Sequence, residues 1–147
     1  MFAKILVGLD GSAAAQHALE QALDMAQLTH GVVTVLSVEE KLPAYAATVG
    51  EMEDEQAFKG EYFRKIHDQA RRLAAAKGVP LQTQTVSGHA ADQLVRTARE
   101  GGHTLLVIGH TGHSRLHNLF LGSTADRVVE HAPCPVLVTR QQAGGSS

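Results

Sequence analysis

The sequence predicts an α/β fold, in which an open sheet of five parallel strands carries helices on both faces. Short apolar runs, typical of strands that are buried on both faces, alternate along the chain with segments whose apolar residues recur every three or four positions, as in amphipathic helices. Strands that alternate with helices form right-handed β-α-β crossovers and therefore a parallel sheet. At 147 residues the chain is expected to form one domain.

The first strand and helix have clear patterns. The apolar run from Lys4 to Leu9 ends in the turn Asp10-Gly11-Ser12, after which alanines and leucines at helical spacing predict a helix to about Leu28. Thr29-His30-Gly31 is expected to close that helix. A second buried strand is predicted over Val32 to Val38.

The middle of the chain is less regular. Residues 39–56 show no periodicity and combine acidic residues with Pro43 and Gly50, so we expect either a mobile flap over a ligand or an inert disordered connection. An amphipathic helix is predicted from Phe58 to about Lys77. Its cationic residues are interpreted as a solvated surface; they are Arg64, Lys65, Arg71 and Arg72.

The last third of the chain repeats the alternation. The run from Leu81 to Val86 alternates with polar residues, so this strand is predicted at an edge of the sheet. The remaining predicted elements are a helix between Ala90 and Gly101, a strand over Leu105 to Ile108, a helix from Ser123 to about His131, and a fifth strand over Val136 to Thr139. Residues 1–140 are expected to form the domain, and the polar, glycine-rich residues 141–147 a disordered tail.

Groups suited to binding an anion cluster between the fourth strand and the fourth helix. Gly109 and Gly112 fit a tight turn, because glycine can adopt positive φ and lets a ligand approach the backbone closely. Gly122 precedes the predicted helix start, where Ser123 and Asp126 have the spacing of a capping box. Free backbone N–H groups at a helix start, two hydroxyls and a cation form the kind of site that holds phosphates; these side chains are Ser123, Thr124 and Arg115.

The spacing Gly109-x2-Gly112-x9-Gly122-Ser123 resembles the G-x2-G-x9-G-[ST] pattern of the nucleotide-binding universal stress proteins. Residues 5–12 are similar to that family's first strand and turn, and residues 133–138 are similar to its last strand. The resemblance implies a Rossmann-like fold of the adenine nucleotide alpha hydrolase type, with the strand order 3-2-1-4-5. In that order Asp10 and the glycine loop meet in one crevice, where such sheets bind ligands.

The resemblance also implies a site for ATP, or for AMP or ADP. The triphosphate would lie on Gly109, Gly112, Gly122, Ser123 and Thr124. From the residues themselves, we expect the cation Arg115 and a protonated His113 to face phosphate. Adenine would contact the backbone at Val38. Asp10 would accept ribose hydroxyls or hold Mg²⁺ through water; alternatively it only caps the following turn. The protein would then be a stress-response sensor or regulator that acts through an unknown protein partner.

Other functions have weaker support from the sequence. His110-Thr-Gly-His113 matches the H-x-G-H signature of nucleotidyl-transferases, but that signature follows the first strand of those enzymes and not the fourth. A slow ATPase or autophosphorylating enzyme, with Ser123 or Thr124 as acceptor, is a further alternative. His110, His113 and His117 could bind a metal, yet no cysteine or carboxylate joins them at typical spacing, so no metal site and no catalytic residue are assigned.

The net charge and the character of the fifth strand predict which partners the protein has. Thirteen Lys and Arg against 15 Asp and Glu give a net charge of −2, which argues against nucleic acid and membrane surfaces as partners. No signal peptide or membrane span is recognised, so we expect a cytoplasmic protein. The fifth strand would be an apolar, unshielded edge, and we expect a homodimer in which two copies pair through Val136, Leu137 and Val138.

Overall fold

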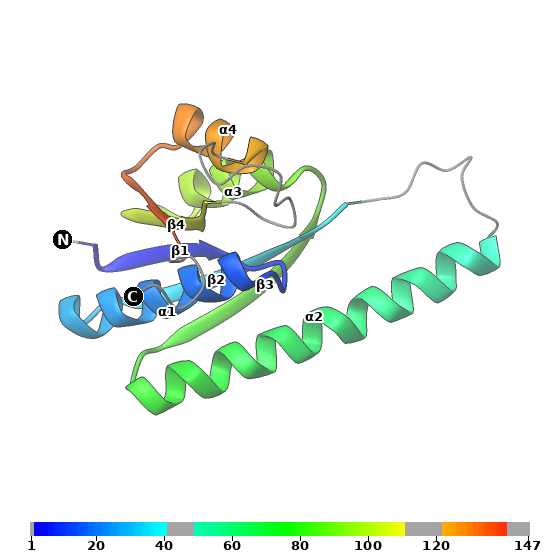
Figure 1. Cartoon of the computed structure of the whole chain (residues 1–147), viewed down its shortest axis with the longest axis horizontal. Coiled ribbons are helices and arrows are strands. Elements are labelled where there is room, and N and C mark those ends of the chain that lie inside the picture. Colours follow the sequence, from blue (N-terminus) through cyan, green and yellow to red (C-terminus); the bar gives the residue numbers. More distant parts are fainter. Residues whose placement is uncertain (1, 41–48, 111–121, 141–147) are drawn as a thin grey trace.

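Five parallel strands form one sheet in the order β3-β2-β1-β4-β5 in the computed structural model, which describes residues 2–40, 49–110 and 122–140 (Figure 1). The strands are β1 (Lys4–Gly8), β2 (Val32–Glu39), β3 (Leu81–Ser87), β4 (Leu105–Gly109) and β5 (Val136–Thr139). The helices are α1 (Ala13–Thr29), α2 (Val49–Lys77), α3 (Ala90–Glu100) and α4 (Ser123–His131). The predicted fold class and strand order are confirmed, with the polar third strand at an edge.

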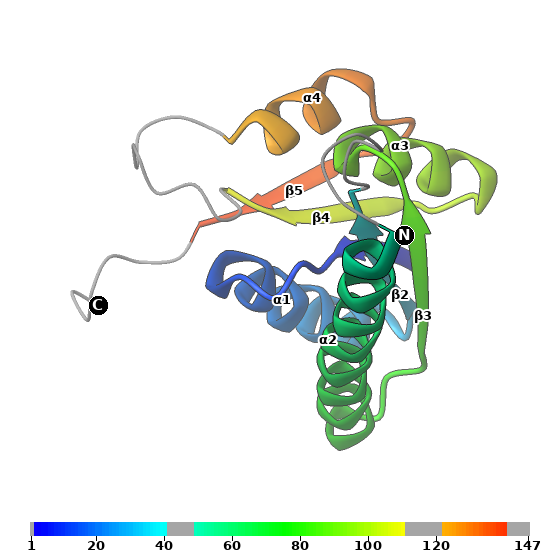
Figure 2. The same ribbon diagram turned by 90° about the vertical axis from the view of Figure 1, so that its right-hand side faces the viewer.

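Helices cover both faces of the sheet and enclose two separate cores. Successive side chains of a strand point to opposite faces, so Ile5 and Val7 of β1 lie with α1 and α2, whereas Leu6 lies with α3 and α4. Figure 2 shows the same division, with α1 and α2 on one side of the strands and α3 and α4 on the other. All three residues of β1 are fully buried, which explains the nearly continuous apolar run.

The ends of α1 follow its sequence signals with one exception. The Ala15 N–H donates to Ser12 Oγ at 3.1 Å, so Ser12 is the N-cap. At the other end His30, and not the glycine after it, adopts the left-handed conformation with φ 57°. Gly31 is required for a different reason, because a Cβ there would lie 2.8 Å from the Ala3 carbonyl oxygen.

The helix α2 begins earlier than predicted, at Val49 in place of Phe58. Part of the expected flap is therefore helical, and residues 41–48 lie outside the described residues, as does the tail at 141–147. Glu, Met, Gln and Ala favour helix without any apolar periodicity, which is why a search for an amphipathic pattern misses these turns. In Figure 1 the first turns of α2 extend past the end of the sheet.

The start of α4 corrects a second prediction. Its N-cap is Gly122, with φ −63° and ψ 158°, and no side chain of a described residue caps the helix. Ser123 is the first helical residue, so the capping box expected between Ser123 and Asp126 is wrong. Gly122 takes the extended conformation that an N-cap needs, which moves the serine hydroxyl into the helix and out of capping position.

Candidate functional site

The strand order predicts a crevice beyond the carboxyl ends of β1 and β4. These two strands are neighbours at the centre of the sheet, with Val7 opposite Val107. After β1 the chain continues into α1 on one face, and after β4 it reaches α4 on the other. The two connections therefore diverge from one point, which is where open α/β sheets bind ligands.

The turn after β1 is held from two directions. The Ser12 N–H donates to Asp10 Oδ1 at 2.9 Å, and the Tyr62 hydroxyl, which comes from α2, donates to the Asp10 carbonyl oxygen at 2.9 Å. Gly11 between them has φ 87°, and a Cβ there would overlap the Tyr62 hydroxyl. Asp10 thus caps its own turn, as one of its two interpretations predicted.

Gly109 ends β4, but it does not adopt the positive φ that the sequence suggested for it. A Cβ at this position would lie 2.9 Å from the backbone carbon and oxygen of Ala14, in the first turn of α1. Such a contact is closer than side-chain carbons tolerate, so the glycine lets α1 pack against the end of β4. The tight-turn explanation for Gly109 is therefore wrong, and close packing of the backbone replaces it.

Both ends of the glycine loop meet at one place. The His110 N–H donates to the Thr139 carbonyl oxygen at 2.8 Å, and the Gly122 N–H donates to the His110 carbonyl oxygen at 2.9 Å. One hydrogen bond therefore joins the residue after β4 to the residue before α4, and the two ends of the loop lie side by side. The predicted phosphate ligands Gly112, His113 and Arg115 lie outside the described residues.

The N-terminus of α4 presents a row of hydrogen-bond donors. The first intrahelical bond runs from the Asp126 N–H to the Gly122 carbonyl oxygen at 2.9 Å. The amides of Ser123, Thr124 and Ala125 precede that bond and have no acceptor within the helix. The hydroxyl-bearing Ser123 and Thr124 are exposed. Such a helix start can bind an anion through its amides and its dipole.

Val38 lies on the opposite side of β1 from β4. It pairs with Val86 of β3, and its half-buried side chain packs in the core beneath α3 and α4. The pairing of β1 with β2 ends at Gly8 and Leu36, so Val38 is beyond the last pair, at the level of the Asp10 turn. The structure thus brings Val38, Asp10, Gly109 and the α4 start to the same end of the sheet.

The sequence did not predict a buried polar pair that lies next to the Asp10 turn. The two side chains are Ser37 and His67, and the distance from Ser37 Oγ to His67 Nε2 is 2.8 Å. The Ser37 hydroxyl donates to the Leu9 carbonyl oxygen at 2.6 Å, so it must accept from His67 Nε2–H. Burial lowers the pKa of His67 and Arg71 lowers it further, against the opposing effect of Asp68.

This pair links α2 to the end of β1 and is not a nucleophilic dyad. The Ser37 proton points to a carbonyl and not to the imidazole, so the histidine cannot act as its base in this arrangement. One sequence signal could have revealed the pair, because His67 falls at the buried helical positions that Ala70 and Ala74 continue. A histidine in an apolar stripe needs a polar partner across the interface.

No group of three or more His, Cys, Asp or Glu residues in the described ranges could hold a metal ion, and His113 and His117 of the predicted histidine cluster fall outside those ranges. Among the described residues, no helix has the length and apolar character to span a membrane.

Comparison with known proteins gives one family. The model of the universal stress protein family matches residues 1–140. The universal stress protein YxiE of Bacillus subtilis is 32% identical over 148 residues, which span 95% of this chain and 100% of that protein.

Solved structures agree with this match. The universal stress protein UspA of Lactobacillus plantarum superposes with a TM-score of 0.85 at 28% identity, covering 95% of this chain and 98% of the other. A universal stress protein family protein from Arabidopsis thaliana, solved with AMP bound, has a TM-score of 0.68 at 20% identity, covering 95% and 92%. The second likeness, at this low identity, concerns the fold alone.

Proposed function

This chain belongs to the universal stress protein family, and on that premise we propose that it binds an adenine nucleotide, ATP or a related one, in the crevice beyond β1 and β4. The observation that carries the proposal is the start of α4, where Gly122 provides no side-chain cap and Ser123 and Thr124 are exposed, at the same end of the sheet as the Asp10 turn. AMP is bound by the Arabidopsis thaliana protein of the same fold.

In the proposed complex each group of the nucleotide has a partner. The phosphates lie on the α4 start and on the glycine loop, where Gly112, His113 and Arg115 add donors and charge. Adenine contacts the backbone at Val38, and Asp10 accepts ribose hydroxyls or holds Mg²⁺ through water. The Asp10 carboxylate already accepts from the Ser12 N–H, which fixes its orientation before the ligand arrives.

The proposed role is that of a sensor or regulator in a stress response. A protein that holds a nucleotide without turning it over can report its concentration through the conformation that a partner recognises. We propose a homodimer through β5 and an as yet unidentified protein partner as the route by which the bound state is read. No residue is assigned a catalytic role.

Mass spectrometry of the nucleotide released from freshly purified, denatured protein would identify the ligand. We expect an adenine nucleotide at a substantial fraction of the protein concentration. A protein that releases none, and that binds neither ATP nor AMP in calorimetry at about 1 mM ligand, would contradict the proposal.

A substitution at Gly122 separates phosphate recognition from folding. Its φ of −63° and ψ of 158° are open to any residue, so Gly122→Val should fold normally. The branched side chain would crowd the α4 amides, and we expect ATP affinity to fall by at least about tenfold while adenosine affinity changes less. Equal losses for both ligands would show that the α4 start does not hold the phosphates.

An enzymatic role is the second candidate, because the exposed hydroxyls of Ser123 and Thr124 could accept a phosphoryl group in slow autophosphorylation. Incubation with labelled ATP tests it. The binding role predicts little ADP or AMP over minutes. Release of pyrophosphate at ordinary enzymatic rates would favour a nucleotidyl-transferase, and label on Ser123 or Thr124 would favour the autophosphorylating enzyme.

A further inference from the structure

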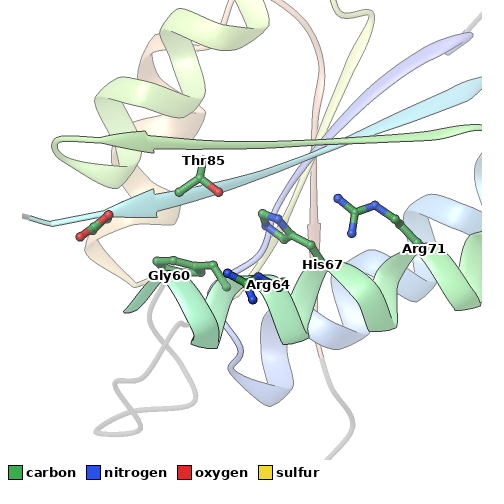
Figure 3. Close-up of a pocket in the computed structure, with 7 residues that line it drawn as sticks. Gly60, Arg64, His67, Arg71 and Thr85 are labelled. Atoms are coloured by element: carbon green, nitrogen blue, oxygen red, sulfur yellow. The ribbon is translucent and has the colours of Figure 1, made fainter. Parts of the chain in front are cut away.

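A cavity of about 310 Å³ lies between α2 and the carboxyl-terminal ends of β2 and β3 (Figure 3). Glu39 and Thr85 line it from the strands, and Phe63, Arg64, His67 and Arg71 line it from the helix. Its volume is at the lower end of the range found for small-molecule sites. The helical residues recur at three- and four-residue steps, so a single face of α2 presents all of them.

The cavity is separate from the crevice proposed for the nucleotide. It lies over the β2–β3 pair, on the face of the sheet that α2 covers. The nucleotide crevice lies between β1 and β4 and takes its phosphate donors from α4, which covers the opposite face. A ligand in the cavity would therefore leave the α4 amides unoccupied, and a nucleotide in the crevice would leave Arg64 and Arg71 unoccupied.

Two guanidinium groups give the cavity its positive charge, and their surroundings differ. Arg71 donates from Nη1 to Asp68 Oδ1 at 2.7 Å and from Nη2 to Thr83 Oγ1 at 2.7 Å, so its orientation is fixed and its charge is partly neutralised. Arg64 is exposed and makes no hydrogen bond or ion pair with any residue that the structure describes. An anion could therefore bind Arg64 without breaking an existing contact.

Other lining groups accept hydrogen bonds. His67 Nε2 is committed to Ser37, which leaves Nδ1 as the acceptor nitrogen of the neutral ring. The Glu39 carboxylate and the Thr85 hydroxyl add acceptors from the strand side. The Phe63 ring stacks on the His67 ring, with 6.4 Å between their centroids, and supplies an apolar wall. A bare anion would be repelled by Glu39, so a suitable ligand must also present donors.

We propose that this cavity binds a small organic anion that carries hydroxyl groups. The anionic group lies on Arg64 and Arg71, and the hydroxyls donate to Glu39, Thr85 and His67. This requirement for an anionic group together with alcohol hydroxyls distinguishes the ligand from inorganic phosphate, which has the charge but no alcohol hydroxyl, and from glycerol, which has the hydroxyls but no charge.

Glycerol 3-phosphate tests the proposal as a probe, with inorganic phosphate and glycerol as its two halves. The ring signals of His67 are followed by NMR in histidine-labelled protein. We expect saturable shifts with glycerol 3-phosphate, and binding weaker by at least about tenfold for either half. Arg64→Gln should reduce the affinity for the probe by at least about tenfold.

Arg72→Gln is the matched control, because Arg72 is an exposed arginine of the same helix that does not line the cavity. It should change the affinity by less than about twofold. Circular dichroism establishes that both variants keep their helix. If no probe shifts His67 up to about 10 mM, or if Arg64→Gln binds like the unmodified protein, the cavity is not an anion site.

A final measurement addresses the nucleotide crevice. The probe titration is repeated with excess ADP, and the proposal predicts that glycerol 3-phosphate binds as before. Displacement of the probe by ADP would overturn the separate site and make the cavity part of nucleotide binding. Because the titration without ADP needs no nucleotide, failure of the proposed nucleotide function would leave its result unaffected.

Discussion

His103 is buried just after α3, and its two ring nitrogens have no hydrogen-bond partner among the described residues. Burial lowers its pKa, and the nearby Lys4 ammonium lowers it further, while the carbonyl groups of Thr97 and Ala98 act in the opposite direction. His67 behaves similarly, because burial and then Arg71 lower its pKa. Both side chains are therefore held in the neutral form by the folded protein.

We predict that the free energy of unfolding decreases as the pH falls below 6.5, the ordinary pKa of histidine. In that range the unfolded chain binds protons that folded His67 and His103 do not bind, so acid favours unfolding. Above it both states are neutral, and below the folded-state pKa the effect stops. Each histidine contributes at most about 1.4 kcal/mol per pH unit.

Urea unfolding at pH 7.5 and 5.5 measures this dependence. His103→Leu removes one of the two groups and should lose less stability between these pH values than the unmodified protein. The same loss in both proteins would mean that His103 takes up its proton without cost in the folded state.

At the scale of elements, α2 is the helix that holds the β1–α1 turn. Tyr62 donates to the Asp10 carbonyl oxygen, and the pair of His67 and Ser37 reaches the Leu9 carbonyl oxygen one turn of helix later. A Cβ on Gly11 would lie 3.0 Å from Ile66 Cδ1 and would overlap the Tyr62 hydroxyl. Close contact with α2 and the left-handed backbone therefore both require glycine at this position.

Gly11→Ala is expected to lower the free energy of unfolding by about 2 to 4 kcal/mol, because it combines backbone strain with a steric clash. In a Tyr62→Ala background the overlap with the hydroxyl is gone, and only the strain and the adjustable contact with Ile66 Cδ1 remain, so the cost should fall to about 1 to 2 kcal/mol. Urea denaturation of the four proteins in this cycle gives both values.

Gly60→Ala is the matched control for that cycle. Gly60 lies on α2, the helix of Tyr62, and a Cβ there would meet no atom of a described residue within 4 Å. The substitution should be neutral or stabilising by up to about 1 kcal/mol, since alanine favours helix. A Gly11→Ala protein as stable as Gly60→Ala would contradict the packing of Tyr62 on this turn.

At the scale of the whole molecule, the two edges of the sheet differ in character. β3 is polar, whereas Val136, Leu137 and Val138 of β5 are apolar and only half buried. The Leu106 N–H bonds to the Pro135 carbonyl and the His110 N–H to the Thr139 carbonyl, so odd-numbered residues of β5 face β4. By the alternation of a strand, the backbone groups of Val136 and Val138 point to the open edge, where the proposed dimer would pair.

Val138→Pro should therefore convert the proposed dimer to a folded monomer. Proline removes an N–H that faces the open edge and leaves the bonds to β4 in place. Light scattering at micromolar concentration measures the mass. Thr85→Pro is the equivalent change on β3, where the Gly88 N–H bonds to the Glu39 carbonyl and Thr85 faces outward, and it should leave the mass unchanged. A dimer that survives Val138→Pro would place the interface elsewhere.

Local pattern was enough to predict the strands and most of each helix in their order along the chain, whereas the resemblance to the family supplied the order of the strands in the sheet. Burial on both faces forces an apolar run at β1 and β4, and a polar third strand can only lie at an edge. The start of α4, which we propose as the anion site, was also visible, because glycine followed by hydroxyl residues marks a helix start. The exact N-cap residue of α4 could not be predicted, since glycine and serine are both common at N-caps and Gly122 and Ser123 are adjacent.

The sequence by itself therefore determined the fold class and the family, and it is the source of the proposal that a ligand binds at the carboxyl ends of β1 and β4. Only the tertiary structure decided the role of Gly109, which makes room for Ala14, and the contacts of Tyr62 and His67 with the Asp10 turn. It also decided that Arg64 and Arg71 line a cavity. Periodicity depends on neighbours along the chain, whereas these contacts join segments tens of residues apart, whose side chains meet only after the layers have packed.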